Sequence, residues 1–281
     1  MMRSGGTQRA RLTSLWIAAF CAFAVLRLSA VELKPATLAV FERYVRLTEA
    51  RMAGEVDGSS PFLWIDRQPA ADRAALFARL ARGEVVAARL ETLDEAKRIQ
   101  IDGGLIHHWI GTVLLTGVTL DRAATFVQGY ERYPDRFTPM IQRSRVIAHS
   151  GDHFDVAMRT WMKKLTIAVV IDADYVIDYR RLSSSRLYTK NVATNLMEVD
   201  SAGTPEERRT PVEQTRGFLW RLSTYCWFEE KPEGTYEQCE SMSLTRAVPF
   251  GLGWLIKGFV TSIPRETLEF TLGQVRDGVA R

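Results

Sequence analysis

The sequence of 281 residues has only three cysteines and four histidines, and beyond its N-terminus it has no excess of basic residues. Its formal net charge of +4 comes from four arginines among the first 30 residues, which contain no acidic residue and no lysine. Removing them leaves 33 basic and 33 acidic residues, too balanced a set to neutralise a nucleic-acid backbone. We therefore expect no nucleic-acid partner. A composition with 46% hydrophobic and 25% charged residues also excludes a collagen-like or wholly disordered chain.

Residues 1–30 have the pattern of a secretory signal peptide. Three arginines precede an apolar run over 12–26, and small residues follow at positions 29 and 30. The run is shorter than the roughly 20 residues that a membrane-spanning helix needs. We expect export to the periplasm or the exterior, with cleavage after Ala30. An uncleaved N-terminal anchor is the alternative, because Arg27 interrupts the small-residue pattern before the cleavage site.

Two cysteines remain after the signal segment, and an even number fits an oxidising compartment. Cys226 and Cys239 flank a predicted hairpin whose turn lies at 231–234. If Glu230 pairs with Thr235, the register places the two cysteines directly opposite each other on one face, near disulfide range. A disulfide and a pair of reduced, packed thiols both fit this arrangement.

Residues 31–105 form a mostly helical segment in our interpretation. Apolar residues at helical spacing predict a helix over 36–53, and a second helix over 70–82 ends at Gly83. Between them, 62–65 is a short strand or an apolar packing segment. The composition changes near residues 103–104, where we place a domain boundary.

From residue 106 onward, strand patterns dominate. A strand over 106–115 and a short helix capped by Thr119 precede seven strand-like runs, over 142–149, 153–161, 165–171, 175–182, 186–199, 218–230 and 235–248. Short turns between them predict an antiparallel meander. Pro264 suits the first turn of a final helix. One stripe of this helix must pack against the sheet, and it consists of Leu268, Leu272, Val275 and Val279.

This order of elements resembles the START-like, helix-grip (SRPBCC) superfamily of polyketide cyclase/dehydrase-like and lipid-carrier domains, over residues 106–281. The resemblance is carried by the segments 217–222, 236–244, 249–253 and 263–272. It implies an α+β fold in which an antiparallel sheet curls around a long C-terminal helix, with an apolar cavity between them. The helical segment 31–105 precedes this domain and lies outside the resemblance.

The alternation of residues along the predicted hairpin divides it into two faces. The alternate positions from 237 to 245 are mostly polar, so we assign the other, more apolar face to the cavity. Arg221 and Glu240 are two rungs apart on that face and could pair diagonally. The alternatives are a structural ion pair or reversed faces. The predicted ligand-binding residues are Arg221, Tyr225, Trp227, Glu240 and Met242.

The histidines give no metal-binding pattern. His107 and His108 are adjacent on a strand and therefore point to opposite faces, so they cannot chelate one ion. His149 and His153 straddle a turn, and no H-E-x-x-H motif is present. We expect neither a metal nor a cofactor.

Two functions fit these patterns best, ahead of an envelope interaction protein in which residues 31–105 dock a partner. The first is an exported binding protein that holds an apolar small molecule or lipid, because no catalytic constellation is visible. The second is a cyclase/dehydratase- or hydrolase-type enzyme that uses Glu240, Tyr225 or Arg221 in the same cavity. A small basic-aromatic patch, Lys163 and Lys164 beside Trp161, suggests a transient contact with a membrane surface, although ordinary solvated charges explain it equally.

Overall fold

The computed structural model describes residues 33–164, 167–215, 218–247 and 253–280. The expected signal segment 1–30 lies outside these ranges, as do residues 249–252 of one quoted motif. The strands are β1 (Val86–Arg89), β2 (Leu93–Asp94), β3 (Lys97–Arg98), β4 (Gly104–Thr116), β5 (Ile141–Ser150), β6 (His153–Lys164), β7 (Ile167–Arg181), β8 (Arg186–Asp200), β9 (Arg208–Pro211), β10 (Arg221–Lys231) and β11 (Gly234–Arg246).

One antiparallel sheet contains every strand except β2 and β3, which form a small ribbon of their own. Its order is β1-β4-β11-β10-β8-β7-β6-β5, and β9 pairs with β8. The helices are α2 (Pro35–Val56), α3 (Ala70–Ala81), α4 (Leu120–Gln128), α5 (Tyr133–Arg136) and α6 (Gly253–Val279), with 3-10 turns η1 (Trp64–Arg67), η2 (Tyr130–Arg132) and η3 (Val212–Gln214). Within the described ranges, none of these helices has the length and apolarity to cross a membrane.

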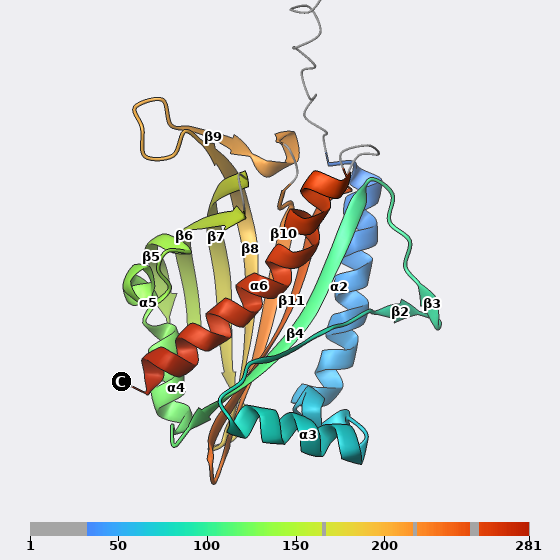
Figure 1. Cartoon of the computed structure of the whole chain (residues 1–281), viewed down its shortest axis with the longest axis vertical. Helices are drawn as coiled ribbons and strands as arrows, with labels where there is room; N and C mark the ends of the chain where they lie inside the picture. The colour runs from blue at the N-terminus through green and yellow to red at the C-terminus, as the bar shows by residue number, and fades with distance from the viewer. Residues whose placement is uncertain (1–32, 165–166, 216–217, 248–252, 281) are drawn as a thin grey trace, which may run out of the picture. The chain divides into compact units, whose positions relative to one another are not determined.

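Helices cover both faces of the sheet (Figure 1). On one face, α6 and α4 contribute to a core that includes Val113 of β4 and Phe228 of β10. On the other face, α2 and α3 contribute to a second core that includes Trp227 and Met242. Consecutive residues of one strand point to opposite faces, so neighbours such as Trp227 and Phe228 enter different cores. The sheet is therefore the middle layer of a three-layer structure.

This architecture confirms the predicted α+β, helix-grip fold. The final helix crosses the curved sheet (Figure 1), and its predicted stripe is buried, with Leu272 at 0% and Val275 at 2% exposure. The hairpin β10–β11 has the predicted register, with Glu230 opposite Thr235. Gly234 closes its turn at a φ of 137°, where a side chain would overlap the carbonyl oxygen of Leu115.

Two local predictions were wrong, and one open alternative is resolved. The two strands expected over 165–171 and 175–182 are one strand, β7, because β6 and β8 pair with it on both sides through the acidic residues at 172 and 174. Pro264 lies inside α6 rather than in its first turn, since that helix begins at Gly253. Of the two alternatives for 62–65, the structure has the apolar packing segment and not the strand, because the segment leads into η1 and Leu63 and Ile65 are fully buried.

The N-terminal helices and the sheet share a core. Phe41 and Met52 of α2 belong to the same buried cluster as Tyr225 and Leu244 of the central strands. Residues 31–281 form one compact unit. The domain boundary that we placed near residues 103–104 stays a prediction.

A substitution at Gly111 tests the packing of α6 against the sheet. A Cβ there would lie 2.7 Å from Leu272 Cδ1 and 3.2 Å from Leu268 Cγ. Gly111→Val should therefore lower the free energy of unfolding by about 1–3 kcal/mol, as overpacking does. Gly273→Ala, on α6 itself, has no atom within 4 Å of the added Cβ and should be neutral or stabilise by up to ~1 kcal/mol. Urea denaturation of both variants checks this, and equal stabilities would contradict the described packing.

Candidate functional site

A cavity of about 280 Å³ lies between the concave face of the sheet and α6. Strands β6, β7, β8, β10 and β11 form its wall, and α4, α5 and α6 close it. Its volume is near the lower end of the range for small-molecule sites, about 300–1,000 Å³. Most of the lining is apolar, and it includes Phe137, Met158, Ile177, Phe228, Leu268 and Leu272.

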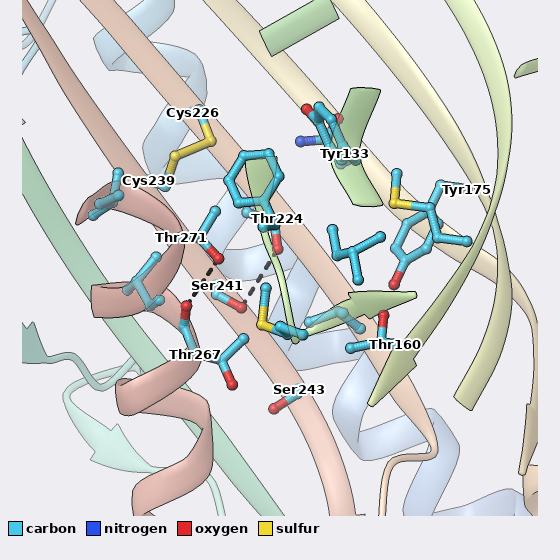
Figure 2. A pocket seen from close by; sticks show the side chains of 18 of the residues that line it. Tyr133, Thr160, Tyr175, Thr224, Cys226, Cys239, Ser241, Ser243, Thr267 and Thr271 are labelled. Carbon is cyan, nitrogen blue, oxygen red and sulfur yellow. Dashed lines mark hydrogen bonds between the residues drawn. A yellow bond between two sulfur atoms is a disulfide. The ribbon is translucent and has the colours of Figure 1, made fainter. Parts of the chain in front are cut away.

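The polar part of the cavity is built by the central hairpin and by α6. Alternate residues of β10 and β11 face the cavity, and Figure 2 shows Ser241 and Ser243 among them. Thr224 donates a hydrogen bond to Ser241 over 3.4 Å. From the helix side, Thr267 and Thr271 face the same space (Figure 2), and the Thr271 hydroxyl donates to the Thr267 carbonyl over 2.9 Å. These small side chains leave open the space that larger residues would fill.

The disulfide predicted as one of two alternatives is present. Cys226 and Cys239 are directly opposed and bonded to each other, and both sulfurs lie at the cavity wall (Figure 2). Glu237 lies on the same face, two residues before Cys239. The three side chains come within 4.8 Å of one another, a spacing that suits a metal site. The disulfide removes both thiolates, however, so only a carboxylate would remain as a ligand.

Glu237 is the one acidic residue in the described part of the cavity lining, and it is only 3% exposed. Burial raises the pKa of its carboxyl to about 8, so it holds a proton at neutral pH. Its Oε1 lies 3.8 Å from Cys239 Sγ, which has no proton to donate in the disulfide. Oε2 has no hydrogen-bond partner among the described residues. A polar group buried in this way needs a partner from elsewhere.

Tyrosines complete the polar surroundings of Glu237. Burial raises the pKa of Tyr133 and Tyr179 above the usual tyrosine range, and the negative charge that Glu237 carries once it is ionised raises both further. Burial also raises the pKa of Tyr175 to about 12, although its hydrogen bond with Thr160 opposes the shift. All three phenols are therefore neutral at physiological pH. The described lining contains no lysine, arginine or histidine.

The face assigned to the cavity from the sequence was wrong, although the register was right. The five predicted site residues are not among those that line the cavity. Tyr225, Trp227, Glu240 and Met242 are buried on the opposite face, in or beside the core that α2 covers. The reason is that α2 makes this face a second core, so its apolar character does not mark the ligand side.

Arg221 and Glu240 do not form the expected diagonal pair. The Arg221 guanidinium donates to Glu213 over 2.6 Å and to the carbonyl of Trp220 over 2.6 Å. Glu240 instead accepts from Arg51 of α2 and from His108 Nε2, the latter over 2.6 Å. Arg221 is thus part of a surface ion pair with Glu213, whereas Glu240 joins α2 to the sheet.

His108 continues this buried network toward α2. The Tyr44 hydroxyl lies 2.8 Å from His108 Nδ1 and accepts from the backbone N–H of Thr92 over 2.8 Å. Burial alone would raise the pKa of Glu240, but His108 and Arg51 hold it below its usual value. Glu240 is therefore an ionised structural group.

The two adjacent histidines point to opposite faces, as predicted. His107 Nε2 lies 2.9 Å from the hydroxyl of Thr245, which lines the cavity. Burial lowers the pKa of His107 to about 4, so this imidazole is neutral. His108 lies in the network on the α2 side.

The sequence did contain a signal for the correct face. A solvated strand face usually carries long charged side chains, but alternate residues from 237 to 245 are one glutamate, one cysteine, two serines and one threonine. Such small polar residues suit a confined space. No sequence signal identified Tyr133, Tyr175 or Tyr179, because only the folding of the sheet brings α5 and β7 to the same cavity.

The structural role of Glu240 is testable by its pH dependence. Glu240→Gln removes a buried charge that partners Arg51 and His108, so it should lower the free energy of unfolding at pH 7 by about 3 kcal/mol. The lowered pKa of Glu240 means that its contribution is present above pH 4.5 and is lost as the pH falls through the folded value. The difference from wild type should therefore shrink below pH 4.5. Denaturant unfolding measures it, with the exposed Glu42→Gln as control; a constant difference would contradict this role.

The disulfide should appear in mass and in stability. Reduction should add two hydrogens to the mass of protein made in an oxidising compartment. Because the cysteines are 13 positions apart in the sequence, the Cys226→Ala/Cys239→Ala variant should lose about 3 kcal/mol of unfolding free energy. Reductant should not destabilise that variant further. An unchanged mass on reduction would show that the thiols are free.

No protein-family model and no curated protein matches the chain. Among solved structures, a STAR-related lipid transfer protein from Xanthomonas axonopodis covers 69% of this chain and 99% of its own, with 12% identity and a TM-score of 0.44. The Zhui aromatase/cyclase from a Streptomyces species covers 63% and 95%, with 9% identity and a TM-score of 0.44. A START superfamily protein from Mycobacterium smegmatis covers 63% and 97%, with 10% identity and a TM-score of 0.36. These low scores carry no argument about ligand or activity, and the helix-grip fold follows from the sheet order and α6 themselves.

Proposed function

We propose that this chain is an exported binding protein that holds an apolar small molecule or lipid between the sheet and α6. The observation that carries the proposal is the cavity itself, which has a mainly apolar lining and a few polar groups on one wall. Small-molecule sites have this composition, because apolar surface supplies affinity and a few polar groups fix orientation.

Export to the periplasm or the exterior is part of the proposal. The pattern over residues 1–30 supports it. The disulfide between Cys226 and Cys239 supports it independently, since such bonds persist in oxidising compartments. A brief contact with a membrane surface would let an apolar ligand enter. The exposed Lys163 and the half-buried Trp161 at the end of β6 are candidates for that contact.

Chemistry on the bound molecule is the second candidate function. The residues proposed for it from the sequence, including Glu240 and Tyr225, lie on the other face of the sheet. Glu237 supports it instead, because a carboxyl that keeps its proton at neutral pH is a suitable general acid. A cyclase or dehydratase reaction could use such a group.

Copurified ligand gives a direct test. The chain from Val31, produced in a bacterial periplasm and purified without detergent, should show a higher mass under native than under denaturing conditions. The extra mass should be extractable into organic solvent. The same mass under both conditions, together with no binding of added apolar probes, would contradict the proposal.

Filling the cavity should remove that extra mass. Ser241→Phe places a large ring beside Thr224 inside the cavity and should reduce the ligand-bound fraction at least tenfold. Thr194→Phe changes an exposed threonine on β8 and should leave the bound fraction unchanged. Thermal melting of both variants verifies that they are folded.

A further inference from the structure

Among the residues that the structure describes, the cavity lining contains one carboxyl without a hydrogen-bond partner and no lysine, arginine or histidine. Glu237 is only 3% exposed. Among the described residues, Oε2 has no hydrogen-bond partner, and the sulfur nearest to Oε1 belongs to the disulfide and has no proton to donate. A protonated carboxyl carries one O–H donor, which must find an acceptor or remain a costly buried group. The acceptor cannot be Cys239, because its sulfur is a very weak acceptor and lies 3.8 Å away.

The charge balance of the lining restricts what can supply that acceptor. Fatty acids, phospholipids and other anions need a lysine or arginine, or several oriented N–H donors, when they leave water. The described lining offers none of these side chains, and its one titratable acid would repel an anion once ionised. An uncharged ligand avoids both costs.

We propose that Glu237 donates a hydrogen bond to a carbonyl or ether oxygen of an uncharged, mainly apolar ligand, and that this contact selects against the corresponding anion. The inference rests on the proposed binding function and names its ligand class. The hydroxyls of Thr224 and Ser241 on the same wall can accept or donate further bonds to such a molecule. With a volume of about 280 Å³, the cavity suits a compact ring system or a single chain better than a lipid with two acyl chains.

Ionisation of Glu237 should make this contact dependent on pH, because the other titratable groups near it stay neutral. The charge of ionised Glu237 raises the pKa of Tyr133 of α5 and of Tyr179 of β7. The hydroxyl oxygen of Tyr130 in η2 lies 2.5 Å from that of Tyr179. The disulfide lies on β10 and β11, and the described lining residues of α6 include no titratable group. All the tyrosines are neutral up to the pH at which Glu237 ionises, about 8. Loss of binding near that pH would therefore report on Glu237.

Three probes with one ring system test the proposal: 2-acetylnaphthalene, which is uncharged and carries a carbonyl; 2-naphthoate, its anionic analogue; and naphthalene, which lacks an acceptor. Affinities are measured by equilibrium dialysis at pH 6.5 and pH 9.5, on protein stripped of ligand by organic extraction and shown to be folded. The variants are Glu237→Gln, whose amide still donates, and Glu237→Leu, which cannot. Glu240→Gln on the opposite face is the matched control.

Wild type should bind 2-acetylnaphthalene at least tenfold more tightly than the other two probes at pH 6.5, and should lose this preference at pH 9.5. Each pH unit above the pKa lowers the protonated fraction about tenfold. Glu237→Gln should keep the preference at both pH values, and Glu237→Leu should lose it at both. Glu240→Gln is less stable, but its folded form should show the same probe preferences as wild type at both pH values.

The other outcomes separate the inference from the proposed function. If wild type binds all three probes equally, without an effect of pH or of Glu237→Leu, the carboxyl is satisfied by water; this inference is overturned and the binding function stands. Tighter binding of 2-naphthoate would also overturn it. If wild type binds none of the probes at either pH and carries no copurified ligand, the binding function itself fails.

Discussion

The central hairpin β10–β11 has no solvent face, because α2 and α6 cover the two sides of the sheet. Each residue of β11 must therefore suit one of two interiors. On the α2 side the interior is densely filled by large side chains such as Trp227 and Met242, which are fully buried. On the α6 side small hydroxyl residues leave a cavity open. The location of the site follows from this difference in side-chain size rather than from polarity.

Two glutamates three positions apart on β11 show how strongly each interior changes the pKa of a buried carboxyl. Glu240 is surrounded by Arg51 and His108, and these partners lower its pKa despite complete burial. Glu237 has no such partner in the described part of the chain, and burial raises its pKa to about 8. A glutamate on one face is thus ionised and links α2 to the sheet, whereas a glutamate on the other face is a neutral hydrogen-bond donor.

The local features of the fold could be predicted because short-range rules determine them. A turn at 231–234 and an assumed pairing of Glu230 with Thr235 predicted the hairpin register, and with it the opposition of Cys226 and Cys239, as the structure has them. Helical spacing gave the buried stripe of α6 that includes Leu272. We predicted two strands in place of the continuous β7 because aspartate is common in turns. In the fold, Asp172 instead forms an ion pair with Arg159 over 2.6 Å.

The assignment of faces could not follow from the same rules. To assign the faces of an alternating strand, we assume that one face contacts solvent and the other is buried. This assumption fails when a segment distant in sequence covers the second face. Helix α2 is separated from β11 by more than 170 residues, as the contact between Arg51 and Glu240 illustrates. Nothing in the hairpin itself reports the presence of that helix.

The position of the disulfide has a consequence for how the protein is made. The sulfurs of Cys226 and Cys239 belong to the surface that a ligand would touch. A chain produced in a reducing host would present two thiols to that ligand in place of a closed bridge. Electrophilic molecules could then be captured covalently, and metal ions could bind with Glu237 completing the set. The choice of expression compartment therefore alters the chemistry of the binding surface as well as the yield of folded protein.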